Sequence, residues 1–537
     1  MVSKGLALLF FLLLSMLPTS AASPEPEDVW FRNGAITRGH PPANRWSTPV
    51  LLLGIATFLY LNLFALPNVP FLLNGDQVFF WMDAQRMLHG ERAYVDFFQY
   101  TPPGTDLFYL AVFKVLGPRI YATDIVVLGL GVALCWVCFR VAKRIMAPKL
   151  ALPGTMLFLT LIYTRILNAT HHWFSVLLCM AAIWILMDDR SVLRLNVAGA
   201  LLGLAAFFTQ SHGAATLLAV SVFLTWDGVR HGKQLREVMK APAVVLLGFV
   251  LAFLVSSSYF IATIGLKQLW YSQATYVRQF VVHRPETSLL GMPLPLSWRT
   301  GQYAFVYVLL SVVYPLTLWK CCARQDEATS AQRTQLALLS MVGFLLLVEV
   351  MFSLNWLRLY AVSMPGIILF AWFLGRAGGV WHHTVTLTWI GVIGIGLLQI
   401  WSAHSRPSII TELRGGWAAV TPQNYEELSW FIQHTQRGEF VFQARWPGLY
   451  LPLDLRNPAF IDVVGTTDQT RPQHIARTIK DLESRQVKYV LWSPTLNHPD
   501  GSRSVQENPL APLVDYLHSR YIPVHTFSDH DEVWERR

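Results

Sequence analysis

Long apolar blocks restrict the fold of this chain more than any other feature of its sequence. Blocks of about 17 to 25 residues recur along most of its 537 residues, and each is long enough as an α-helix to cross the roughly 30 Å hydrocarbon core of a bilayer. Inside hydrocarbon, every backbone N–H and C=O group needs a partner within the protein, which favours helices. With 53% hydrophobic and only 14% charged residues, the chain is too apolar for an average soluble domain. The sequence therefore predicts a polytopic α-helical membrane protein.

About eleven segments are expected to span the membrane. They are residues 49–66, 121–142, 150–167, 172–187, 195–209, 213–226, 241–263, 302–319, 334–352, 363–375 and 384–402. The short pair at 195–226 could instead form a shallow hairpin. Lysine and arginine gather after every second span, as after the second span at 140–149, which is the pattern of cytoplasmic loops. We therefore interpret the net charge of +9 as membrane orientation and expect no nucleic-acid partner.

The two ends of the chain lie outside this module of spans at 49–402. Residues 1–23 contain a lysine, a short apolar core and small residues, as a signal peptide does. Arg32, Arg38 and Arg45 instead favour a cytoplasmic position, so both a cleaved signal and a membrane-associated segment stay open. An odd number of spans places residues 403–537 outside the cytoplasm.

Residues 403–537 alternate between helical and strand-like patterns. Residues 424–433 and 474–483 have the spacing of amphipathic helices, and residues 439–444, 459–464, 487–493 and 521–527 have that of strands. All five cysteines precede this stretch, so no disulfide framework is expected there. The sequence predicts a small α/β domain on the extracytoplasmic side.

The first outer loop, residues 67–120, carries five carboxylates between two apolar spans. The spacing predicts a helix over 76–88 and a second one over 105–116, with "TPPG" between them. Asp83, Glu91 and Asp106 are expected mainly to keep the loop soluble. Asp76 differs because a charge at the boundary of a span costs free energy unless it lines a cavity.

The stretch "GDQVFFWMDAQRMLHGERAYVDFFQYTPPGTDLFYLAVFKVLG" lies between a span and a second span that ends in basic residues. It resembles the N-terminal half of membrane glycosyltransferases of the GT-C class, in the style of protein O-mannosyltransferases, aminoarabinose transferases and bacterial enzymes that modify lipopolysaccharide core sugars. The resemblance covers residues 49–402 in architecture and about 74–146 in detail. It implies a polyprenyl-phosphate sugar donor, an active site outside a bacterial inner membrane, and Asp76 as the catalytic carboxylate of the first outer loop.

The chemistry of sugar transfer independently favours one carboxylate at this position. An acceptor hydroxyl is a poor nucleophile, and a carboxylate that removes its proton during attack typically contributes about 10² to 10⁴ in rate. The leaving phosphate is already a stable anion, so it needs cations around it rather than a carboxylic acid. Asp76 as the one base would suffice for an inverting displacement onto a glycan, lipid or protein acceptor.

Further candidate residues lie in three outer segments. Asp96, within "YVDFFQYTPPG", is expected either to contact substrate or to fasten the loop. Arg358 and Tyr360, within "NWLRLYAVSMP", are placed at the outer mouth between two spans, where they could bind the donor phosphate or anchor the interface. The basic residues expected outside, against the usual bias, are Arg165, Lys267, Arg278, Arg284, Arg299 and Arg358.

His171 and His172, within "NATHHWFS", are candidates for hydrogen bonds to a phosphate or sugar. A divalent metal is possible, but neighbouring histidines rarely reach one ion and no HxxxH spacing accompanies them, so no cofactor or metal ligand is assigned. Simple packing at the interface is the remaining interpretation. Gln210, Ser211 and His212, within "FFTQSHGAA", are expected mainly to form a turn between two apolar blocks, and lining the cavity is the alternative.

These observations favour a polyprenyl-phosphate-dependent glycosyltransferase over two alternatives. A transporter or flippase of lipid-linked sugar predicts charges within the spans and repeated halves, and Glu349 is the main charge in an apolar block. A polymerase or ligase of lipid-linked polysaccharide should carry a large outer loop late among the spans. Here the polar mass lies in the first loop and in residues 403–537.

Overall fold

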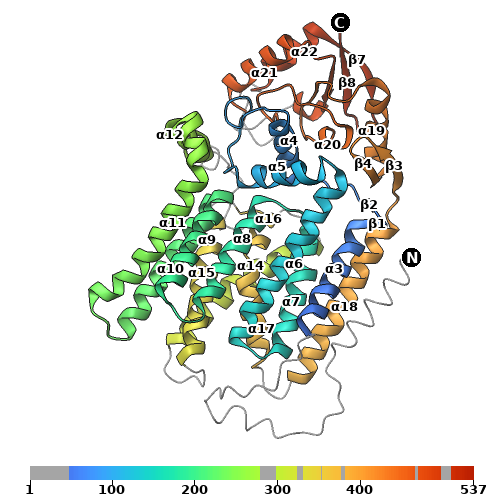
Figure 1. Cartoon of the computed structure of the whole chain (residues 1–537). Coiled ribbons are helices and arrows are strands. Elements are labelled where there is room, and N and C mark those ends of the chain that lie inside the picture. The colour runs from blue at the N-terminus through green and yellow to red at the C-terminus, as the bar shows by residue number, and fades with distance from the viewer. Residues whose placement is uncertain are drawn as a thin grey trace.

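The computed structural model describes residues 47–278, 298–322, 330–351, 354–376, 381–465, 470–497 and 509–537. The signal-like segment 1–23 lies outside these described residues. Long apolar helices form a bundle, and a smaller layer of helices and strands covers one end of it (Figure 1). The first outer loop lies between the bundle and the C-terminal layer.

Helix occupies each of the eleven segments in which a span was predicted. The bundle contains α3 (Ser47–Leu63), α6 (Ile120–Ile145), α7 (Pro148–Leu157), the π-helical turn η1 (Phe158–Ile162), the 3-10 turn η2 (Tyr163–Ile166), α8 (His171–Leu186), α9 (Val192–Phe208), α10 (Gln210–Arg230), α11 (Leu235–Ile264), α14 (Trp298–Cys322), α15 (Ser330–Met351), α17 (Met364–Leu374) and α18 (Trp381–Ser405). Within the described residues, six of these helices are long and apolar enough to cross a bilayer, namely α6, α10, α11, α14, α15 and α18. The length of α10 argues against a shallow hairpin.

The third expected span is a broken helix, because α7 continues through η1 and η2 instead of remaining α-helical. The break frees backbone carbonyls that a membrane interior cannot satisfy with water. Gln399 in α18 donates to the Thr160 carbonyl at 2.7 Å, and Gln302 in α14 donates to the Leu161 carbonyl at 2.8 Å. Side chains from two neighbouring helices thus stabilise the irregular segment that ends beside Arg165.

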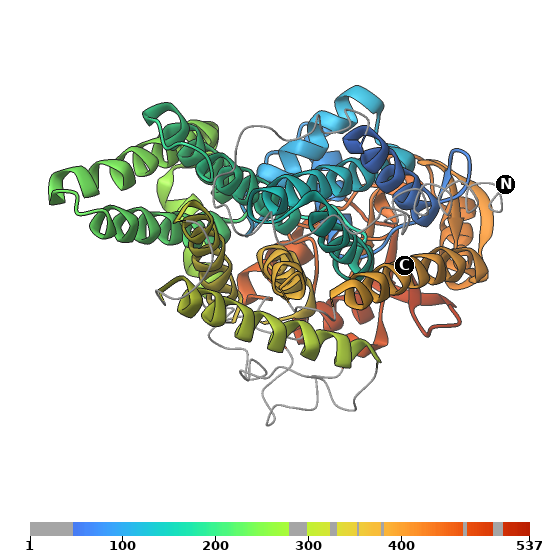
Figure 2. The same cartoon turned by 90° about the horizontal axis from the view of Figure 1, so that it is seen from below.

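Helices α9 and α11 pack closely because glycines remove the side chains between them. A Cβ atom added at Gly199 would lie 2.1 Å from the Val245 carbonyl oxygen, and one at Gly203 would lie 2.4 Å from that of Phe249. Small residues four positions apart allow this approach between membrane helices. Together with α10, these helices stand at one side of the bundle, in green in the view from below (Figure 2).

The first outer loop folds into a short hairpin and two helices. Its elements are β1 (Phe64–Leu66), β2 (Val69–Pro70), α4 (Gln77–Leu88) and α5 (Gly104–Leu116). Helix α4 stops where Gly90 adopts a φ of 89°, a left-handed conformation that favours glycine. Both predicted loop helices are therefore present.

The C-terminal layer combines short helices with two sheets. Its elements are β3 (Ile409–Leu413), β4 (Gly416–Val420), α19 (Pro422–His434), β5 (Val441–Gln443), α20 (Tyr450–Leu453), α21 (Pro472–Ser484), β6 (Tyr489–Trp492), α22 (Ala511–Arg520), β7 (Tyr521–Thr526) and β8 (Glu532–Arg536). The larger sheet has the order β5-β6-β8-β7, with β5 and β6 parallel and the other pairs antiparallel. Helices α19 and α21 lie where the sequence predicts them, as do three of the four expected strands.

The predicted strand at 459–464 is wrong, and the first outer loop explains why. Arg86 of α4 donates to the Ala459 carbonyl at 2.9 Å, and the Phe98 N–H donates to the Phe460 carbonyl at 2.7 Å. These backbone groups therefore bind the loop instead of a neighbouring strand. The segment has bends in place of extended structure.

The first outer loop and the C-terminal layer share hydrophobic cores. Phe98 packs against Phe460, Tyr276 and His474. Met82 of α4 belongs to a second core with side chains from α19 and α20. The C-terminal layer thus holds the loop that carries Asp76 in place over one end of the bundle.

Candidate functional site

Asp76 lies at the start of α4, in a turn that is anchored on both sides. On one side, Trp446 of the C-terminal layer donates its indole N–H to the Asn74 side-chain oxygen at 2.6 Å. On the other side, the Ala169 N–H, in the segment between η2 and α8, donates to the Gln77 side-chain oxygen at 3.1 Å. Asp76 makes no side-chain capping bond to its own helix. Its carboxylate is therefore positioned by its neighbours and is available for other contacts.

Arg358 approaches Asp76 from a distant part of the sequence. It belongs to the short helix α16 (Trp356–Ala361), where the Asn355 side chain caps the helix by accepting from the Arg358 N–H at 2.9 Å. Helix α16 contacts α8 and η2. Partial burial raises the pKa of the Asp76 carboxyl, and the nearby Arg358 charge lowers it, while the residue keeps an exposed surface.

The two predicted histidines lie in the same cluster. Their ring centroids are 3.9 Å apart, and Nδ1 of His171 lies 2.9 Å from the Thr209 hydroxyl at the start of α10. The charge of Arg358 acts on both imidazoles as well as on Asp76. The structure therefore brings together Asp76, His171, His172 and Arg358 from three separate segments of the chain.

A second arginine reaches α16 from the broken helix. Burial raises the pKa of the Tyr360 hydroxyl, and the charge of Arg165 lowers it. Tyr360 is almost fully buried, so it supports the site from within α16. Among the other basic residues expected outside, Lys267 and Arg278 are exposed.

Of the remaining basic residues expected outside, Arg284 and the side chain of Arg299 lie outside the described residues.

Asp96 makes contacts that differ from those of the other candidates. Its Oδ2 atom accepts from the Arg92 backbone N–H at 2.7 Å and lies 3.4 Å from the Arg92 Nε. These are the contacts expected if Asp96 fastens the loop, which is one of the two roles considered for it from the sequence.

Two residues of the cluster were not assigned from sequence. His212 is fully buried, with Nδ1 2.8 Å from the Ser175 hydroxyl and Nε2 3.4 Å from the Glu349 carboxylate. Its ring centroid lies 5.1 Å from that of His172. The prediction that His212 mainly forms a turn is therefore wrong. Glu349, interpreted as a charge within an apolar block, lies two residues before the end of α15.

The expectation that Asp83, Glu91 and Asp106 serve mainly solubility is also wrong. Asp83 and Asp106 are fully buried, and the Gln99 amide donates to Oδ2 of each, at 2.7 and 3.1 Å. Burial raises the pKa of both carboxyls, and the charge of Asp462 raises them further. This carboxyl cluster of Asp83, Asp106 and Asp462 joins the first outer loop to the C-terminal layer.

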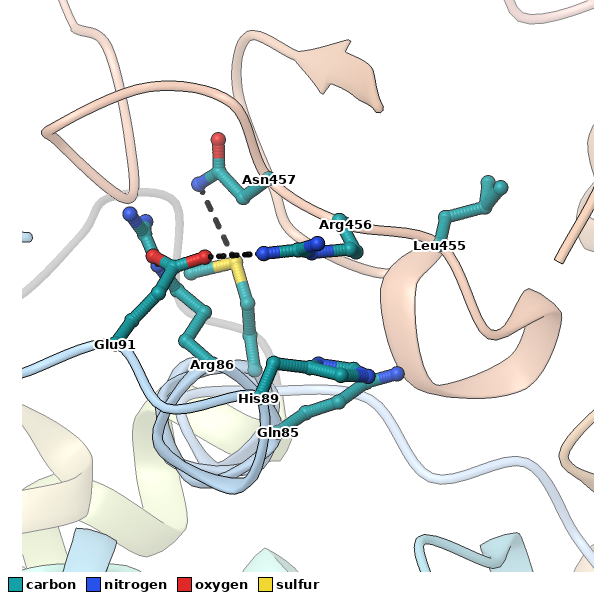
Figure 3. Close-up of a pocket in the computed structure, with 8 residues that line it drawn as sticks. Gln85, Arg86, His89, Glu91, Leu455, Arg456 and Asn457 are labelled. Carbon is teal, nitrogen blue, oxygen red and sulfur yellow. Dashed lines mark hydrogen bonds and ion pairs between the residues drawn. The ribbon is translucent and has the colours of Figure 1, made fainter. Parts of the chain in front are cut away.

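A chain of ion pairs lines a small pocket at the same interface (Figure 3). Glu91 lies between Arg86, at 2.8 Å, and Arg456, at 3.1 Å. The pocket leaves about 10 Å³ for the centre of a water-sized sphere, which is about enough for one water molecule. The ion pairs hold the first outer loop against the C-terminal layer.

A possible metal-binding group lies elsewhere. Within the described residues, Glu427, Asp529 and Asp531 form the only group of three or more His, Cys, Asp or Glu side chains whose ligand atoms lie close enough together to hold an ion. They belong to the C-terminal layer. His171 and His172 are not part of such a group.

The fold resembles solved membrane glycosyltransferases, although no protein-family model matches the sequence and no curated protein matches it. The oligosaccharyltransferase of Archaeoglobus fulgidus, tethered to an acceptor peptide, is 12% identical with a TM-score of 0.50, over 84% of this chain and 70% of that one. ArnT from Cupriavidus metallidurans, bound to undecaprenyl phosphate, is 12% identical over 91% of this chain and 98% of that one, with a TM-score of 0.41. The mycobacterial arabinofuranosyltransferase AftD is 13% identical over 93% of this chain and 40% of that one, with a TM-score of 0.49.

At these identities the likeness establishes the fold alone. It rests on the archaeal oligosaccharyltransferase, because the TM-scores for ArnT and AftD are below 0.5. The chain has a GT-C fold, as the sequence resemblance implied.

Proposed function

We propose that this chain, with its GT-C fold, is an integral-membrane glycosyltransferase. It moves one sugar from a polyprenyl-phosphate donor to a hydroxyl of an extracytoplasmic glycan, lipid or protein acceptor. The observation that carries this proposal is that the charge of Arg358 acts on Asp76 at the end of the bundle that the C-terminal layer covers. A base for the acceptor and a cation for a phosphate are the two groups that this chemistry requires.

Asp76 acts as the general base of a single displacement. The acceptor oxygen bonds to the anomeric carbon while its proton passes to the Asp76 carboxylate. The bond from the anomeric carbon to the phosphate oxygen breaks, and its electron pair leaves with the polyprenyl phosphate. The anomeric centre inverts. Burial makes the carboxylate more basic, and the charge of Arg358 favours its ionised form.

Arg358 binds the donor phosphate, and Arg165, whose charge acts on Tyr360 of the same short helix, adds a second cation. A guanidinium donates two parallel hydrogen bonds to a phosphate and remains charged at any physiological pH. His171 and His172 add imidazole donors next to Arg358. The polyprenyl tail stays in the bilayer against the apolar helices, which is why the enzyme must be a membrane protein.

The proposed orientation places Asp76 and the C-terminal layer outside a bacterial inner membrane. Helix α6 begins after the first outer loop and ends with Lys143 and Arg144. Arg144 pairs with Asp188 at 2.7 Å beyond the end of α8, whose other end carries the histidines. Basic residues therefore lie at the opposite end of the bundle from Asp76, as a cytoplasmic face requires.

Comparative mass spectrometry of membranes with and without this chain tests the proposal. The expected result is a glycan, lipid or protein acceptor whose mass increases by one sugar residue only when the chain is present. An unchanged glycan inventory, combined with altered sidedness of a lipid-linked sugar, would favour a flippase instead.

A further inference from the structure

Glu349 is a second carboxylate at the outer end of the bundle, and the proposed displacement does not use it. Its side chain is 18% exposed, whereas the His212 side chain beside it is 0% exposed. Within the described residues, the Glu349 Oε2 atom and the His212 Nε2 atom have no hydrogen-bond partner and face each other at 3.4 Å. A carboxylate in such a position is costly unless a donor approaches it.

The surrounding hydrogen bonds fix the orientation of His212. The Ser175 hydroxyl donates its one proton to the His172 carbonyl at 2.9 Å. It must therefore accept at its 2.8 Å contact with Nδ1 of His212, so Nδ1 carries a proton. This leaves Nε2 directed at Glu349. Nε2 can donate to Glu349 only when the ring carries a second proton, and in that imidazolium form His212 holds the carboxylate from the buried side. The other, partly exposed side of Glu349 then faces a ligand.

The negative charge of Glu349 determines which part of a lipid-linked sugar it can bind. His212 lies 3.4 Å from Glu349, and the charge of Arg358 also acts on its imidazole. A phosphate is attracted to the guanidinium and repelled by the carboxylate. Sugar hydroxyls are neutral hydrogen-bond donors, and they extend from the same anomeric carbon that carries the phosphate.

We propose that Glu349 accepts hydrogen bonds from hydroxyl groups of the donor sugar, with His212 as its positioning residue. This inference rests on the proposed function and extends it to sugar recognition. Glu349 then contributes to the affinity for the sugar, whereas Arg358 contributes to the affinity for the lipid phosphate.

Binding measurements on the full chain in lipid nanodiscs separate these two contributions. The probes are undecaprenyl phosphate and its glucosyl, mannosyl and arabinofuranosyl derivatives. We expect at least one sugar-bearing lipid to bind more tightly than the bare lipid phosphate. Glu349→Gln should weaken the binding of that lipid by about 10-fold or more, since hydrogen bonds to charged groups are among the stronger ones. It should change the affinity for the bare lipid phosphate by no more than about 2-fold.

His212→Asn tests the positioning role through the same ratio of affinities. It should lower the preference for the sugar-bearing lipid, and combining it with Glu349→Gln should cause little further loss, because both act on one contact. Glu349→Asp, which keeps the charge on a shorter side chain, should also reduce the preference. Glu237→Gln changes an exposed glutamate at the start of α11 and should change neither affinity.

Two outcomes would overturn the inference alone. One is a Glu349→Gln chain that retains the full preference for the sugar-bearing lipid. The other is a Glu349→Gln chain that binds the bare lipid phosphate more weakly by the same factor as the sugar-bearing lipid. If the unmodified chain binds none of the four lipids, the proposed function itself falls.

Discussion

The Arg358 charge lowers the pKa of Asp76, while burial of the same carboxylate raises it. The two residues come from the first outer loop and from the short helix α16, so folding brings them together. Opposite effects of this kind keep a carboxylate ionised and yet more basic than it is in water. A general base near the membrane surface needs both properties.

Replacing Arg358 by glutamine should shift the acid limb of the pH profile of kcat/KM to higher pH. Burial would then raise the pKa of Asp76 without the opposing charge, so the base would be protonated over a wider acidic range. Arg358→Lys should shift the limb less, because it retains a positive charge. An acid limb that stays in place in Arg358→Gln would contradict the coupling.

Replacing Asp96 by asparagine should leave most of the sugar transfer intact. Its carboxylate fastens the loop through Arg92, and an exposed ion pair of this kind contributes only about 0 to 1 kcal/mol. Steady-state rates with saturating donor and acceptor provide the measurement. A steady-state rate that is lower by 100-fold or more, in a variant that is fully expressed, would instead indicate that Asp96 contacts the substrate.

The carboxyl cluster should make the contact between the first outer loop and the C-terminal layer weaken as pH rises. Burial raises the pKa of Asp462 to about 7, and those of Asp83 and Asp106 are raised as well. A carboxyl whose pKa is raised on folding stabilises the folded state fully at a pH below its pKa in the unfolded chain, about 3.9. This stabilisation is lost as the pH rises toward and through the pKa in the folded chain. The slope approaches about 1.4 kcal/mol per pH unit for each proton held.

Hydrogen exchange of peptides from α4 and α5 between pH 5.5 and 8.5, corrected for intrinsic rates, measures this weakening. Asp106→Asn keeps an oxygen for the Gln99 amide and removes one ionisable group, so it should flatten the dependence. Asp515→Asn, an exposed change in α22, should not. A pH-independent opening free energy in the unmodified chain would contradict the expectation.

Replacing Gly199 by alanine should lower the melting temperature. The new Cβ atom would meet the Val245 carbonyl at 2.1 Å, where the backbone of α11 cannot yield easily. Gly129→Ala in α6 provides the matched control, since no atom lies within 4 Å of its Cβ position and alanine favours helix by about 1 kcal/mol. Equal melting temperatures for the two variants would refute the packing argument.

Hydropathy patterns located the apolar helices well, because length and polarity alone decide which segments suit a bilayer. The interruption of α7 was not predicted, since it depends on Gln302 and Gln399 from helices far away in sequence. The expected strand at 459–464 failed for a similar reason. Its backbone groups bind the first outer loop, which no local pattern reveals.

The candidate site was partly predictable. Asp76, His171, His172 and Arg358 stood out because polar residues at the ends of apolar spans are costly without a purpose. His212 and Glu349 met the same criterion but lay within or beside apolar blocks, so their proximity to each other could not be predicted. Asp83 and Asp106 were misinterpreted because sequence alone did not show that the C-terminal layer covers the loop.

Sugar transfer by Asp76→Asn, compared with the unmodified chain, tests the central claim most directly. The account predicts a rate lower by about 10² to 10⁴, with affinity for undecaprenyl phosphate retained and with Asp515→Asn fully active. An Asp76→Asn chain that transfers sugar at the unmodified rate would contradict the role of this carboxylate as the base.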